Sequence, residues 1–183
     1  MNIVLGVSGS ISAYKAADVT SRLTKAGHDV HVILTDGGSR FITALTLQTL
    51  SKNKVYTDTF DEDDPSVVNH IYLADNADMV AVVPASADLI GKAASGIADD
   101  MLTSTLLAAL NQSIVVMAPA MNTNMYENPI VQGNMEKLAS YGVRFIEPKS
   151  SLLACGTVGK GALADVDVIV KYIEELEGEI GHD

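Results

Sequence analysis

The chain has 183 residues, of which 48% are hydrophobic and 19% are charged, and its formal net charge is −11. This length and composition are typical of one globular domain rather than of a disordered protein. The negative charge argues against nucleic acid or an anionic membrane as a partner, but a small anion can still bind to local backbone donors, because salt screens the global field beyond about 10 Å.

The N-terminus predicts no export signal, because the apolar run 2–7 follows no basic segment. No apolar stretch approaches the length of about 18 residues that a membrane span needs. The single cysteine, Cys155, cannot form an internal disulfide, and no His or second Cys lies within four residues of it. We therefore expect a cytoplasmic protein without a metal site.

Short apolar runs alternate with helical patterns along most of the chain. Strands are expected at 2–7, 29–34, 79–84, 113–118 and 144–146. Helices are expected at 11–26, 89–94, 101–110 and 131–141, with a last one from about Asp165. The alternation predicts an α/β fold, namely a single-domain doubly wound (Rossmann-like, flavodoxin-like) parallel sheet with helices on both faces. The domain should cover 1–177, and 178–183 should form a frayed tail.

Ligands of doubly wound sheets bind beyond the C-terminal ends of the strands. After the first strand, Gly6, Ser8, Gly9 and Ser10 are small enough to let the backbone approach a phosphate. The segment matches neither the GxGxxG nor the Walker pattern, so a dinucleotide or a nucleoside triphosphate gains no support. An ordinary turn with a serine cap is the alternative.

Two further loops follow predicted strands. In the loop 35–41, Thr35 and Ser39 offer hydroxyl groups and Phe41 offers an aromatic face. The loop 84–88 could hold the edge of a planar heterocycle through Ser86, Ala87 and Asp88. Either loop could instead simply cap a helix, so neither identifies a site by itself.

Three other features carry chemistry. The segment 119–126 has no hydrophobic period, and its Asn122 can present a carboxamide NH₂ to a carboxylate. His70 stands among apolar residues, so two interpretations remain open: a buried core histidine and a functional one. Cys155 lies in a run that Gly156, Gly159 and Gly161 make pliable, unlike the usual buried cysteine, so a reactive thiol and a filler remain alternatives.

These segments, in this order, resemble the flavin-containing cysteine decarboxylases over essentially the whole chain. The family's motifs stand here as His70-Ile71-Tyr72-Leu73, as 119–125 (Pro-Ala-Met-Asn-Thr-Asn-Met), as Ala154-Cys155-Gly156 with Gly159-Lys160-Gly161, and as the segments 85–88 and 91–100. Each motif is weak alone, whereas the ordered set is highly specific. Three positions depart from the family: Asp88 replaces the usual Asn, Tyr126 replaces Trp, and Ala162 stands where bacterial members often carry Arg.

The resemblance implies FMN as the cofactor, with contacts from the small and hydroxyl-bearing residues noted above: Gly6, Ser8, Gly9, Ser10, Thr35, Ser39, Phe41, Ser86, Ala87 and Asp88. It implies that Ala120, Asn122 and Met125 bind the substrate. It also implies that His70 is the catalytic base and that Cys155 donates the final proton.

The branch of the family that fits best converts 4′-phosphopantothenoylcysteine to 4′-phosphopantetheine in coenzyme A biosynthesis. The substrate thiol is oxidised to a thioaldehyde, CO₂ leaves to give an enethiol, and the enethiol is then reduced. Members form homotrimers or multiples of trimers with flavin between subunits. The chain ends before the ligase domain of many bacterial homologues, so we expect a stand-alone enzyme and, as a possible partner, a separate phosphopantothenate–cysteine ligase.

Two alternatives remain open. A peptidyl-cysteine oxidative decarboxylase would stop at the enethiol and would need no flap cysteine, so Cys155 argues against it. A non-catalytic regulatory flavoprotein would be expected to lose His70 or Cys155, and both are present.

Overall fold

A computed structural model of the chain describes residues 1–62, 64–152 and 158–180. Within these residues, six parallel strands form one sheet in the order β3-β2-β1-β4-β5-β6. Their bounds are Asn2–Val7 (β1), Asp29–Leu34 (β2), Val55–Tyr56 (β3), Met79–Ala85 (β4), Ile114–Pro119 (β5) and Arg144–Phe145 (β6). This order reverses between β1 and β4, as in Rossmann-like sheets, so the predicted doubly wound fold is confirmed.

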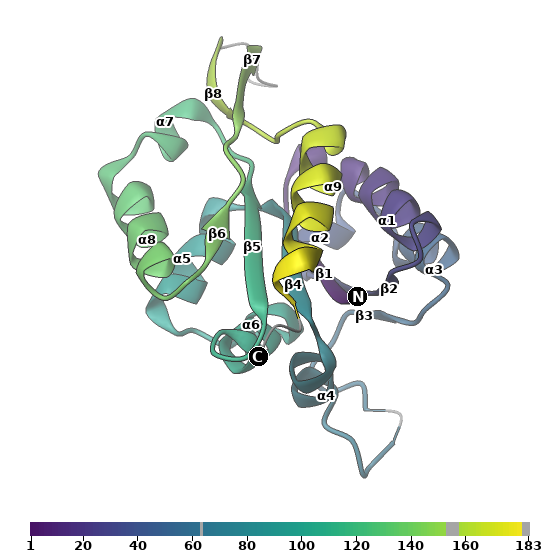
Figure 1. Cartoon of the computed structure of the whole chain (residues 1–183). Coiled ribbons are helices and arrows are strands. Elements are labelled where there is room, and N and C mark those ends of the chain that lie inside the picture. The colour runs from purple at the N-terminus through teal and green to yellow at the C-terminus, as the bar shows by residue number, and fades with distance from the viewer. Residues whose placement is uncertain (63, 153–157, 181–183) are drawn as a thin grey trace.

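Helices cover both faces of the sheet (Figure 1). One face carries α1 (Lys15–Lys25), α3 (Ala44–Ser51) and α9 (Val166–Glu175); the other carries α4 (Asn69–Asn76), α5 (Ala87–Ser95), α6 (Met101–Ala109) and α8 (Pro129–Ser140). Shorter helices occupy the loops: η1 (Ile11–Tyr14), α2 (Asp36–Ser39), α7 (Thr123–Tyr126) and η2 (Leu176–Glu179). Burial of apolar residues on each face accounts for the near-continuous hydrophobic strands.

The sequence did not predict α3, β3 and α4, which lie between β2 and β4. The two-residue β3 is defined by pairing with β2, where Val55 lies opposite Val32. The helix α3 buries only Leu47 and Ser51, so it shows little apolar periodicity. The N-terminus of α4 is capped by Glu62, whose carboxylate accepts from the Asn69 N–H at 3.0 and 3.2 Å. Because these elements depend on tertiary pairing and on a cap seven residues away, local pattern does not reveal them.

A second, two-stranded antiparallel sheet joins β7 (Lys149–Leu152) to β8 (Val158–Ala162). This hairpin projects at the top of the molecule in Figure 1, beside α7, whereas α4 lies at the bottom. The segment that connects its strands contains Cys155 and lies outside the described residues.

The last described residues are held to the sheet. Glu179, in the segment expected to fray, accepts two hydrogen bonds from the Arg144 guanidinium, at 2.6 and 2.9 Å. In the described part of the chain, no helix is both long and apolar enough to cross a bilayer.

Candidate active site

A cavity of about 690 Å³ lies at the C-terminal edge of the sheet, around the point where the strand order reverses. Its lining comes from the segments that follow five strands, β1 to β5, and from the segment just before α6: Ser8, Gly9, Ser10, Thr35, Asp36, Gly37, Thr57, Ser86, Ala87, Asp88, Leu89, Lys92, Asp99, Asp100, Ala120, Met121 and Met125. Cavities of roughly 300–1,000 Å³ are the usual size of small-molecule and cofactor sites.

The loops after β1 and β2 touch through their backbones in this cavity. A Cβ added to Gly9 would lie 3.1 Å from the Gly37 backbone, and one added to Gly38 would lie 2.5 Å from the Val7 carbonyl oxygen. Larger residues would therefore separate the loops. The result is a lining of exposed backbone and small side chains, which fits the phosphate end of a flavin nucleotide.

Gly6 serves a different purpose from the one expected. It lies within β1, outside the cavity lining, and a Cβ there would meet the Leu102 side chain at 2.5 Å. Its missing side chain lets α6 approach the sheet, so a contact of Gly6 with a cofactor finds no support in this structure.

Ser8 braces two loops of the cavity. Its buried hydroxyl donates to the Pro84 carbonyl at 2.7 Å and accepts from the Ser86 N–H at 2.9 Å. Because the hydroxyl both donates and accepts within the protein, Ser8 supports the cavity lining. Ser10 and Thr35 cap the helices that follow them, accepting from the N–H groups of Ser12 and Gly38 at 3.2 and 3.0 Å.

We expect Ser8→Ala to lower the free energy of unfolding by about 1–3 kcal/mol, because the Ser86 N–H loses its acceptor in a nearly dry site. Urea unfolding of the flavin-free protein would measure it. Ser39→Ala is the matched control, since its hydroxyl donates to the Asp36 carbonyl on the surface. An equal loss of unfolding free energy in the two variants would contradict this structural role of Ser8.

Lys92 contributes a fixed positive charge to the cavity wall. Its ammonium lies 3.2 Å from Asp99 and 3.4 Å from Asp88. The hydrogen bond to Asp99 is the main cause that raises the pKa of Lys92 above its usual value, with smaller contributions from the charges of both carboxylates. Lys92 thus stays protonated at neutral pH, and the carboxylate that departs from the family pattern, Asp88, is ion-paired.

Most of the predicted cofactor contacts come together here. The lining contains Ser8, Gly9, Ser10, Thr35, Ser86, Ala87 and Asp88, together with Ala120 and Met125 from the predicted substrate segment. Ser39 and the half-exposed Phe41 lie outside it. Sequence reasoning missed Thr57, Lys92, Asp99 and Asp100; the family-like segment 91–100 was the available signal for three of them.

Asn122 caps α7 beside this cavity. Its Oδ1 accepts from the Asn124 N–H at 2.8 Å, which fixes the orientation of the carboxamide. Its neighbour Met121 lines the cavity. The structure therefore puts the predicted carboxylate-binding residue at the rim of the predicted cofactor site.

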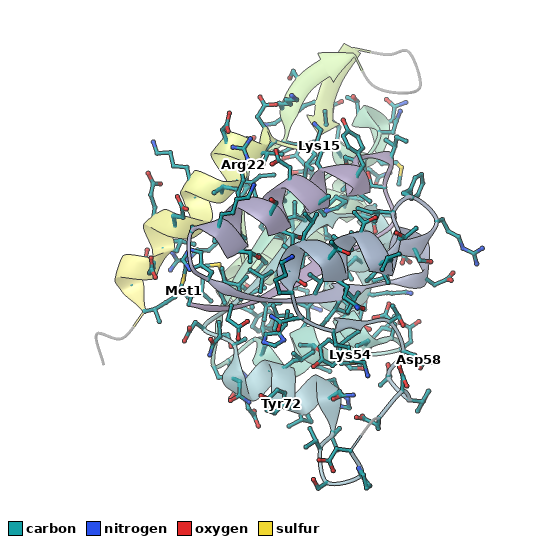
Figure 2. The ribbon with its side chains drawn as sticks, turned by 90° about the vertical axis from the view of Figure 1, so that its right-hand side faces the viewer. Met1, Lys15, Arg22, Lys54, Asp58 and Tyr72 are labelled. Carbon is teal, nitrogen blue, oxygen red and sulfur yellow. The ribbon has the colours of Figure 1, made fainter. Side chains whose placement is uncertain are left out.

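His70 is not part of this cavity in the single chain. It is the second residue of α4, half-buried rather than a core residue, and its Nδ1 has no hydrogen-bond partner among the described residues. The two views agree that α4 lies at the opposite end of the molecule from the β7–β8 hairpin; Figure 2 labels Tyr72 on that helix. One chain thus does not bring His70 to Asn122, and Cys155 falls outside the described residues.

Comparisons with known proteins identify the family of this chain. The family model described as Flavoprotein matches residues 1–177. The chain belongs to the Flavoprotein family. It is 54% identical to the probable phosphopantothenoylcysteine decarboxylase of Streptococcus mutans, over 94% of this chain and 97% of that protein.

The chain is also similar to a longer relative and to two solved structures. It is 53% identical to the coenzyme A biosynthesis bifunctional protein CoaBC of Bacillus subtilis over 95% of its own length, but it spans only 42% of that protein. A structure of a Cys-to-Ser variant of PPC decarboxylase complexed with pantothenoylaminoethenethiol superposes with a TM-score of 0.88 at 30% identity, covering 97% of this chain and 98% of that one. The FMN binding protein AtHal3 gives 0.83 at 30% identity, with 99% and 98% covered.

Proposed function

We propose that the protein is an FMN-dependent decarboxylase that converts 4′-phosphopantothenoylcysteine to 4′-phosphopantetheine in coenzyme A biosynthesis. One observation carries the proposal: Ala120, Met121 and Met125, which flank Asn122 in the substrate segment, line the same cavity as the small-residue loops after β1 and β2. The relatives named for this activity support it at high identity and coverage.

FMN is the flavin that we propose for this cavity. The backbone around Gly9 and Gly37, with the Ser10 and Thr35 hydroxyls, would hold the phosphate, and the segment 86–88 would border the ring. A bound flavin supplies the two-electron oxidation of the substrate thiol and the later return of those electrons. The chain's own residues orient the substrate and handle its protons: Asn122 holds the carboxylate, His70 accepts a proton, and Cys155 donates the last one.

If His70 acts on a substrate bound in this cavity, it must come from a second copy of the chain, because His70 is absent from the cavity lining of its own chain. Exposed apolar side chains surround it at the start of α4 and just before it: Val68, Ile71 and Tyr72 are 52%, 42% and 48% exposed. Such a patch favours burial against another protein surface. We propose a homotrimer in which α4 of one subunit brings His70 to the cavity of its neighbour, so that each site is built from two subunits.

We propose a separate phosphopantothenate–cysteine ligase as the enzyme that supplies the substrate. The bifunctional relative in Bacillus subtilis extends well beyond the part that this chain matches. A ligase that forms phosphopantothenoylcysteine produces the compound that this site is proposed to consume.

The test of the function is a direct assay. We expect the purified protein to be yellow, to release FMN on denaturation, and to form CO₂ and 4′-phosphopantetheine from phosphopantothenoylcysteine. Chromatography of the released chromophore and mass spectrometry of the products would measure both. A colourless protein that ignores added FMN would refute the cofactor assignment, and CO₂ release from a C-terminal cysteine peptide alone would favour the peptidyl-cysteine alternative.

A further inference from the structure

The strand β8 lies directly across the substrate segment. The Met121 N–H donates to the Gly161 carbonyl at 2.9 Å. Gly161 has φ = +139°, and a Cβ there would lie 2.5 Å from the Met121 carbonyl oxygen. Backbone therefore meets backbone at this point, which only glycine permits.

Gly159, two residues earlier in β8, makes the second close contact, here with a side chain rather than with backbone. A Cβ at Gly159 would lie 2.4 Å from Oγ1, 2.7 Å from Cγ2 and 3.1 Å from Cβ of Thr123. Rotation of the threonine side chain moves Oγ1 and Cγ2 but leaves its Cβ in place. The two glycines thus enclose Asn122 between their contact points at Met121 and Thr123.

Lys160, between the two glycines, ties β8 to the neighbouring elements. Its ammonium lies 5.7 Å from the centroid of the Tyr126 ring and forms an ion pair with Glu147. These contacts oppose a displacement of β8 away from α7. A side chain added at position 159 is therefore expected to move the segment 121–123.

We propose that Gly159 and Gly161 are positioning residues: by seating β8 on Met121 and Thr123, they set the place of the Asn122 carboxamide that binds the substrate carboxylate. This inference rests on the proposed function of the site. It assigns a role to the flap strand separate from that of its cysteine, because Asn122 keeps its place only while β8 is seated.

The test compares Gly159→Ala, Thr123→Ala and the double variant. We expect Gly159→Ala to lower kcat/KM for CO₂ release by about 10- to 100-fold, mainly by raising KM, because an error of about 1 Å in substrate placement has effects of this size. Thr123→Ala should lose much less activity than Gly159→Ala, since it keeps the backbone and Cβ on which β8 is seated and Thr123 Oγ1 has no hydrogen-bond partner among the described residues. The double variant should recover most of the loss, because alanine at position 123 removes the two nearest colliding atoms.

Two further variants make the test specific. Gly161→Ala collides with backbone, so Thr123→Ala should not rescue it. Gly133→Ala on α8 is the matched control, because a Cβ there meets nothing within 4 Å. FMN content should stay near the wild-type level in Gly159→Ala, since Gly159 lies outside the cavity lining.

The outcomes separate the two proposals. Wild-type kinetics in Gly159→Ala, or a double variant as impaired as the single one, would overturn the positioning role. An inactive wild-type protein would instead refute the proposed function. In that case a crystal structure of Gly159→Ala decides the positioning role alone: a displaced Asn122 supports it, and an unmoved Asn122 refutes it.

Discussion

His70→Asn is expected to lose CO₂ release by about 10²–10⁴-fold, the range for removal of a general base. Asn122→Asp should lose a similar amount, because its negative charge faces the substrate carboxylate and weakens binding as well. FMN content should stay near normal in both variants, since neither residue lines the cavity. Rates of CO₂ release from phosphopantothenoylcysteine measure the effect, and near-wild-type turnover would remove that residue from the mechanism.

Co-expression of these two inactive variants is expected to restore activity if α4 serves the neighbouring subunit. A mixed site is intact when the His70→Asn chain supplies the cavity with its Asn122 and the Asn122→Asp chain supplies α4 with its His70. If the two chains mix randomly 1:1 in a ring, about a quarter of the sites meet this condition, so about a quarter of wild-type activity is expected. Two differently tagged His70→Asn chains, co-purified in the same way, are the control. Mixed oligomers without activity would place His70 and Asn122 in the same subunit's site or outside catalysis.

Cys155→Ser is expected to abolish formation of 4′-phosphopantetheine while CO₂ is still released. A thiol with a pKa near 8.5 is far more acidic than a serine hydroxyl, so the closing proton transfer should stall. An enethiol, two hydrogens short of the product, should then accumulate in an anaerobic reaction, where mass spectrometry detects it. Absence of CO₂ from a variant that still binds FMN and substrate would place the thiol earlier in the reaction. Normal product formation would make Cys155 a filler.

The sequence alone located the strands that matter most. The runs at 2–7 and 29–34 are predicted with the bounds that the structure shows for β1 and β2, because parallel strands covered on both faces are mostly apolar and both runs end before a small polar residue, Ser8 or Thr35. The loops after them were predicted as the ligand edge by the same logic, and Ser8, Gly9, Ser10 and Thr35 line the cavity. Such features are encoded locally, so one sequence suffices to find them.

Contacts between residues far apart in the chain could not be predicted in this way. Thr57 reaches the cavity from beyond β3, a strand defined only by its pairing with β2. Gly6 sits in a loop-like motif, yet the approach of Leu102 explains its missing side chain. Residue type and spacing do not report which helix packs over which strand, so a glycine needed for packing and one needed for a ligand look alike in sequence.

Periodicity and motif order were enough to identify the fold class, the edge of the sheet where the cavity lies, and the chemical groups of the candidate site: a histidine, an asparagine, and a cysteine in a glycine-rich run. The arrangement of these groups becomes visible only in the folded chain. It places Asn122 under β8 at the rim of the cavity, and it places His70 on α4, away from that cavity. The physical reason is that periodicity and capping act over a few residues, whereas the proximity of two side chains depends on how helices and strands far apart in the chain pack together.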